Sequence, residues 1–83
     1  MIIVVNRTKD EWRGVEVWLN DHYRVTKPSM PPGERFGIPF KSFVAGFGQR
    51  FDPARQIVRG VEVTATTPGG APVKLDWGNG RQR

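Results

Sequence analysis

Residues 12–26 read WRGVEVWLNDHYRVT, and apolar side chains occupy every second position in two parts of this stretch. Val15, Val17 and Leu19 alternate with polar or aromatic neighbours, and the alternation resumes at Tyr23 after a polar break. A period of two is the signature of a strand with one buried face. The stretch therefore predicts two consecutive antiparallel strands whose inner faces line a core.

The length of the connection between these strands follows from the same alternation. A two-residue turn would pair Val17 with Arg24 and place an arginine on the apolar face. A three-residue loop, residues 20–22, pairs Val17 with Val25 instead. We therefore predict the three-residue loop, and a crossing of the chain from one sheet to another at this point would satisfy the pattern too.

Four further strands are predicted on either side of this pair. They cover residues 2–5, 34–40, 61–66 and 73–77. The last two align Val63 with Leu75 and Val61 with Trp77, which predicts a hairpin with one apolar face. Pro39 cannot donate a ladder hydrogen bond, so the strand that contains it should lie at the edge of a sheet.

Two segments lack the alternation and are expected to be loops. Residues 27–33 hold three prolines and end in the Pro-Gly pair of a type II turn. In residues 43–56, Phe43, Phe47 and Phe51 recur at every fourth position, but two glycines between them argue against a stable helix. We expect this second segment to be a long loop that its phenylalanines pin into the core.

The chain of 83 residues has room for one domain. Short strands at intervals of about ten residues, without a helix of consequence, are typical of sandwiches and small barrels. The sequence therefore predicts an all-β fold, a small antiparallel immunoglobulin-like β-sandwich of about six to seven strands, with a small closed β-barrel as the alternative. We expect the domain to cover residues 1–77 and residues 78–83 to form a flexible tail.

Three short motifs resemble a known family. Residues 5–8 read Val-Asn-Arg-Thr at the end of the first strand, residues 14–17 read Gly-Val-Glu-Val, and residues 32–34 read Pro-Gly-Glu before the next strand. This order resembles small bacterial immunoglobulin-like domains of the FxLYD and CARDB kind, over roughly the first half of the chain. The resemblance implies a non-enzymatic interaction or spacer domain of a bacterial envelope or exported protein.

Composition narrows the function classes. The chain has no cysteine, which removes disulfides and thiolate chemistry, and its net charge of +5 favours anionic partners or surfaces without identifying one. The longest apolar run, residues 1–5, is far shorter than a membrane span or a signal-peptide core. We expect no membrane span in this chain.

Catalytic residues are hard to find. His22 is the single histidine and lies in a predicted loop, and neither Ser29 nor Ser42 has an evident base beside it. The carboxylates are scattered, and no grouping has metal-ligand spacing. We therefore expect no enzyme, no catalytic residues, no cofactor and no metal.

A candidate binding surface is predicted around an outward-facing tryptophan. Trp18 should lie opposite Arg24, with Arg35 and Lys41 also pointing outward nearby, and an exposed tryptophan beside arginine can bind a sugar, a base or a peptide. The alternative is that the loop of residues 43–51 covers Trp18, because a small protein needs its large aromatic side chains for stability.

Two functional hypotheses follow. The first is a non-catalytic interaction or spacer module whose partner is another protein or the rest of a longer chain. The second is a basic β-barrel that binds single-stranded nucleic acid through aromatic side chains and arginines. An edge strand, either residues 35–40 or residues 71–77, could also pair with a second copy to give a homodimer.

Overall fold

The structure is a computed structural model that describes residues 1–78, so the predicted tail lies outside the described residues except for Gly78. It contains six strands and one short 3-10 turn. These are β1 (Ile2–Val5), β2 (Trp12–Leu19), β3 (Tyr23–Met30), β4 (Arg35–Ile38), η1 (Phe40–Ser42), β5 (Val61–Thr66) and β6 (Pro72–Trp77). The all-β prediction is confirmed.

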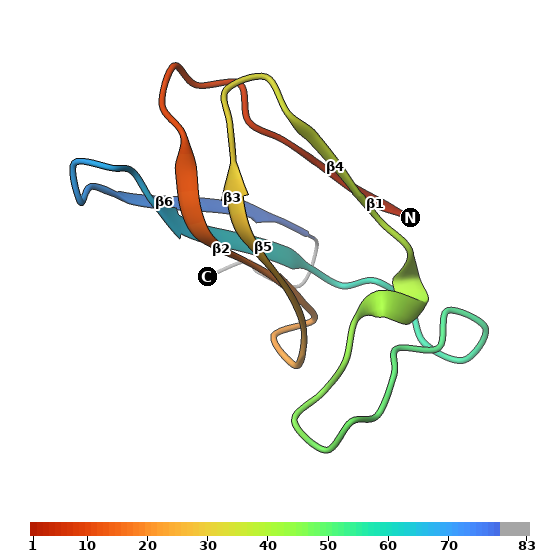
Figure 1. Cartoon of the computed structure of the whole chain (residues 1–83). Helices are drawn as coiled ribbons and strands as arrows, with labels where there is room; N and C mark the ends of the chain where they lie inside the picture. Colours follow the sequence, from red (N-terminus) through yellow and green to blue (C-terminus); the bar gives the residue numbers. More distant parts are fainter. Residues whose placement is uncertain (79–83) are drawn as a thin grey trace.

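The strands of residues 1–78 form two antiparallel sheets (Figure 1). One sheet has two strands, β1 and β4, and the other has four strands in the order β3-β2-β5-β6. Both sheets are open, so the closed-barrel alternative is wrong. The structure is a small β-sandwich with two strands in one layer and four in the other.

Both hairpins of the four-stranded sheet have the predicted register. β2 and β3 pair Val17 with Val25 across a loop of residues 20–22, and β5 and β6 pair Val63 with Leu75. β4 is shorter than predicted and pairs with β1 alone, which confirms that it lies at an edge.

β3 continues to Met30 through Pro28, a segment that was expected to be a loop. The backbone N–H of Arg24 donates to the carbonyl of Val44, so it points away from β2. The N–H groups of every second residue in a strand point to the same edge. The nitrogen of Pro28, which carries no hydrogen, therefore faces the outer edge of β3. No bond to β2 is lost, and the loop prediction was wrong for this reason.

A β-bulge near the start of β2 changes which side chains face inward. Between Arg13 and Glu16 the pairing of β2 with β5 shifts register, and Gly14 has a φ of 58° there. Positive φ suits glycine because it has no Cβ. As a result Trp12 and Val15, which are three positions apart, are both buried.

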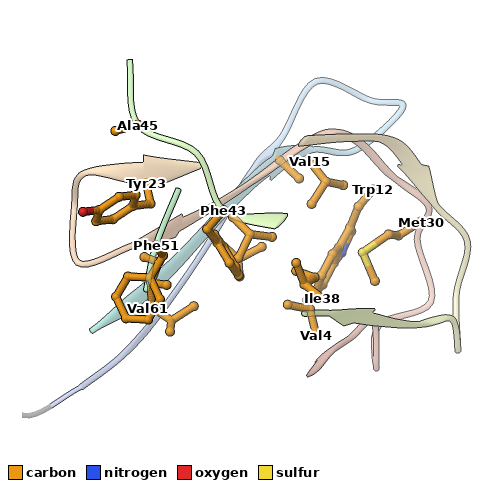
Figure 2. Close-up of a cluster of buried hydrophobic side chains, with 14 residues drawn as sticks. Val4, Trp12, Val15, Tyr23, Met30, Ile38, Phe43, Ala45, Phe51 and Val61 are labelled. Atoms are coloured by element: carbon orange, nitrogen blue, oxygen red, sulfur yellow. The ribbon is translucent and has the colours of Figure 1, made fainter. Parts of the chain in front are cut away.

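The core has an aromatic side chain at each end, as Figure 2 shows. One end gathers Trp12, Met30, Ile38 and Val4, and the other gathers Tyr23, Phe43, Phe51 and Val61. The rings of Tyr23 and Phe51 meet edge to face, with centroids 5.4 Å apart. The segment after η1 therefore completes one end of the core.

The prediction for the phenylalanine-rich segment was right for two of its three rings. Phe43 and Phe51 are buried, but Phe47 is 93% exposed, so the expectation that it enters the core is wrong. The segment is a small hairpin in which the N–H of Phe51 donates to the carbonyl of Phe43 at 3.0 Å. Phe47 lies in the turn of this hairpin, too far from the core to enter it.

Val44 pairs with Arg24 of β3, so the hairpin runs along the outer edge of β3.

Asn6 is a buried polar residue at the end of β1. Its Nδ2 donates to the carbonyls of Met30 and Asp10, both at 2.9 Å. Its Oδ1 accepts from the backbone N–H of Thr8 at 3.0 Å and from the Thr8 hydroxyl at 2.7 Å. The amide thus uses both donors and both acceptor positions, and it joins the β1–β2 connection to the end of β3.

Candidate functional site

Two of the four predicted surface residues lie together. Trp18 and Arg24 are directly opposite on β2 and β3, and the guanidinium carbon of Arg24 is 5.3 Å from the Trp18 ring centroid. Glu16 accepts a hydrogen bond from Trp18 Nε1 at 3.2 Å and lies 3.9 Å from Arg24. Trp18 is half-buried beneath these neighbours, whereas Phe43 and Phe51 point into the core on the other side of the sheet.

The other two predicted residues lie elsewhere. Arg35 is an exposed residue of β4 whose neighbours Phe36 and Ile38 pack toward the core, so it lies on the outer face of the two-stranded sheet. Lys41 is exposed in η1. Because the outer faces of two stacked sheets point in opposite directions, Arg35 is on the far side of the molecule from Trp18. The four residues do not form one surface.

Among residues 1–78, the His, Asp and Glu side chains do not gather into a metal centre. His22 is exposed on the loop between β2 and β3, where its ring meets the edge of Tyr23 at 5.2 Å. Within residues 1–78, no group of three or more His, Asp and Glu side chains could hold a metal ion. Over the same residues, no helix is long and apolar enough to cross a membrane.

A concave region lies at the β2–β3 loop, beside exposed arginines. Asn20 holds this loop against the segment before β5. Its Oδ1 accepts from the backbone N–H of Arg59 at 2.6 Å, and its Nδ2 donates to the carbonyl of Ile57 at 3.0 Å. Arg55 and Arg59 line this region, which is about 400 Å³ in volume. Both arginines are exposed to solvent, so the region is a shallow basic depression.

The most distinctive feature is an apolar groove between the two sheets, with a volume of about 400 Å³. β1 forms one wall, and β5 with β6 forms the other. The large side chains there are unusually accessible: Met1 is 65% exposed, Ile3 51%, Leu75 46% and Trp77 60%. Sequence reasoning placed Leu75 and Trp77 on an inner face but missed that this face is open. We call this region the β1–β6 groove.

The groove is open because the layers have unequal widths. The two-stranded layer is narrower than the four-stranded one: the inner side chains of β5 are buried, whereas Leu75 and Trp77 of β6 are exposed. Within the part of the chain that the structure describes, β1 pairs with β4 alone and β6 pairs with β5 alone. Each wall of the groove therefore includes a strand with an unpaired edge.

The backbone groups on the free edge of β1 can be assigned from the ladder. The N–H of Asn6 donates to the carbonyl of Glu34, in continuation of the β1–β4 pairing. Bonding direction alternates along an antiparallel strand, so Ile3 and Val5 point their N–H and C=O groups the other way. These groups lie along the free edge of β1, beside the groove.

Comparison with protein-family models, curated proteins and solved structures finds no match for this chain. The resemblance to bacterial immunoglobulin-like domains therefore stays a prediction.

Proposed function

We propose that this chain is a non-catalytic interaction module that binds protein by accepting β-structure in the β1–β6 groove. One observation carries the proposal: within residues 1–78, an apolar groove borders two strand edges that pair with no other strand. Large accessible apolar patches on small proteins mark interaction sites. An extended segment added to a free edge gains main-chain hydrogen bonds, and pockets beside that edge select its alternate side chains.

The geometry of the groove supports a particular kind of ligand. A strand beside β1 would bond to the outward backbone groups of Ile3 and Val5. Every second side chain of that strand would point toward Leu75 and Trp77 on the inner face of β6. The expected ligand is therefore an extended segment with apolar residues at alternate positions, the same pattern that builds the domain itself.

Peptide selection tests the proposal. The chain is immobilised at a density low enough to keep molecules apart and is panned against random dodecapeptides. We expect enriched peptides to alternate apolar and polar residues, and to lose binding to the Leu75→Arg variant. Thr26→Arg, an exposed position on β3, is the matched control and should leave binding unchanged. Peptides without alternation, or equal binding to Leu75→Arg, would show that the groove is not the interaction site.

The nucleic-acid hypothesis has less support. Its surface needs free aromatic faces beside several cations, but Arg24 already stacks on Trp18 and Glu16 accepts its indole N–H. Arg35, another of the expected cations, lies on the outer face of the two-stranded sheet, on the far side of the molecule from this pair. The non-enzymatic module is also what the resemblance to bacterial envelope and exported domains implies.

A further inference from the structure

The basic depression at the β2–β3 loop shares no lining residue with the β1–β6 groove. Its volume of about 400 Å³ lies within the range of about 300–1,000 Å³ that is typical of small-molecule sites. Two segments that are far apart in the sequence form its wall, the loop of residues 20–22 with the start of β3, and the connection that leads to β5. The depression is therefore a candidate ligand site that is separate from the groove.

Two side-chain amides hold these segments in place. The Oδ1 atom of Asn20 accepts from the backbone N–H groups of Arg59 at 2.6 Å and Gly60 at 3.2 Å. Within the connection, the Oε1 atom of Gln56 accepts from the backbone N–H of Asp52 at 3.1 Å. Both amide oxygens are thus engaged in holding the backbone, so the amides of the wall offer little acceptor capacity to a ligand.

The hydroxyl of Tyr23 is a donor in this wall. Gln56 Nε2 donates to it at 2.9 Å, and the bond from the backbone of Asp52 to Gln56 Oε1 agrees with this orientation of the amide. The hydroxyl oxygen is the acceptor in that contact, and within residues 1–78 its own hydrogen has no acceptor. Figure 2 shows the hydroxyl pointing away from the buried cluster. Because Tyr23 is only 6% exposed, its packing in the core fixes the position of this donor.

Cations dominate the charge of the wall. Arg55 and Arg59 line the depression with His22, whose ring N–H is a further donor, and no carboxylate of residues 1–78 lines it. Two acids lie nearby, Asp21 in the same loop and Asp52 in the connection. Asp52 Oδ2 is 3.7 Å from Arg55 Nε, but the Arg55 side chain is 87% exposed, and exposed ion pairs contribute little. A ligand oxygen can therefore take the place of this carboxylate.

We propose that this depression binds a phosphate monoester. Its wall presents two guanidinium groups, an imidazole N–H and the Tyr23 hydroxyl as donors, which suits a group with several acceptor oxygens. A phosphate monoester has three such oxygens and a charge of about −1.5 to −2 at pH 7, which matches two arginines. A carboxylate has two oxygens and one charge, so one guanidinium would stay without a partner. Ile57, 69% exposed in the same wall, gives the organic part of the ligand an apolar surface.

The same chemistry separates this ligand from nucleic acid. Each phosphodiester of a nucleic-acid strand carries one negative charge, so it satisfies the two arginines less well than a monoester does. Trp18, the residue expected to contact a base, is not part of the wall. Because both arginines are exposed, we expect a dissociation constant on the order of 1 mM for a simple monoester. Added salt should weaken the binding by screening the charges.

Titration of the full chain with phenyl phosphate, followed by backbone amide chemical shifts in NMR, tests the proposal. At about pH 7.5, where the monoester is mostly a dianion, we expect saturable shifts at residues 20–23 and 55–60. Arg55→Gln and Arg59→Gln should each weaken binding at least about fivefold by removing one charged contact. Arg35→Gln removes the same charge on the far side of the molecule and is the matched control, with affinity unchanged within about twofold.

Further ligands test the charge and the source of the phosphate group. Methyl phenyl phosphate and phenylacetate keep the ring but carry one charge, and both should bind at least about fivefold more weakly than phenyl phosphate. Phosphoserine is compared free and within a short peptide: equal affinity assigns a small molecule as the ligand, and tighter binding of the peptide assigns a protein segment.

Three results would overturn the inference. These are a titration without saturation by about 20 mM, shifts spread over the whole basic surface, and a loss of affinity in Arg35→Gln equal to that in Arg59→Gln. Circular dichroism of each variant checks the fold. The proposed function stands or fails separately, because the depression and the β1–β6 groove have no lining residue in common.

Discussion

Asn6→Ala should be among the most destabilising single substitutions in this protein. The side chain is fully buried and makes four hydrogen bonds, two as donor and two as acceptor. Its removal leaves the buried carbonyl of Met30 without this partner and frees the backbone N–H of Thr8. It also opens a small cavity between β1 and β3.

The magnitude can be worked from these contacts. An orphaned buried acceptor costs about 1–3 kcal/mol, and each part-buried bond contributes about 0.5–1.5 kcal/mol net. Because water can reach the part-buried partners, the expected loss is about 2–4 kcal/mol. A domain of this length has about 4–12 kcal/mol in total, so the substitution should consume a large share of it.

Urea unfolding measures this loss. We expect the midpoint to fall while the m-value stays near that of the unmodified chain, which locates the effect in stability and not in the unfolded state. Thr8→Val is the matched control, since it removes the 2.7 Å hydroxyl bond to Asn6 Oδ1 and two exposed bonds of the same hydroxyl to the backbone of Asp10, but leaves both amide donors of Asn6 in place. It should cost about 0.5–1.5 kcal/mol. A loss below about 1 kcal/mol for Asn6→Ala would refute the role of the amide as a joint between β1 and β3.

Three further predictions follow from particular contacts. Gly14→Ala should lower stability by about 1–2 kcal/mol in thermal unfolding, because the bulge holds φ at 58°; an unchanged melting temperature would mean that the bulge relaxes. Phe51→Ala should cost about 3–5 kcal/mol, whereas Phe47→Ala, at the exposed turn, should change stability by less than about 0.5 kcal/mol. Titration with a single-stranded oligonucleotide at low salt should leave tryptophan fluorescence unchanged, and a quench that salt abolishes would favour the nucleic-acid hypothesis instead.

Much of the fold could be predicted because alternation reports burial directly. The register of both hairpins followed from keeping Val17, Val25, Val63 and Leu75 on one face, and the structure has those pairs. The bulge at Gly14 could not be predicted in this way. The bulge changes which residues of β2 face the core, and it does so through a backbone angle that the alternation of apolar and polar residues does not show.

The errors have physical causes of the same kind. The three prolines of residues 27–33 predict a loop, but the ring nitrogen of Pro28 faces an edge where β2 does not bond. Phe47 shares the spacing of Phe43 and Phe51, but in a hairpin the residue at the turn lies beyond the core, whatever its side chain. Local patterns identified these residues, and the tertiary surroundings determined their exposure.

The candidate site was harder to predict because it depends on the number of strands in each layer, which the sequence pattern of one strand does not show. Trp18 was the residue that suggested binding, yet its ring is covered by its strand neighbour Arg24. Leu75 and Trp77 looked like ordinary core residues, because their alternation is the same as that of Val63. Only the strand count of each layer shows that they face an opening.

The two edges of the four-stranded sheet are treated differently, and this contrast is the strongest reason to regard the groove as a binding site. Along β3 the chain places its own hairpin, with Val44 bonded to Arg24 in both directions. The hairpin covers the backbone of that edge near the loop end. Along β6 no described segment does the same, and Leu75 and Trp77 lie open beside it. Proteins usually block exposed edges because they invite pairing with another chain. An edge left open beside an apolar groove, in a chain that covers the opposite edge, is what a surface built for strand pairing requires.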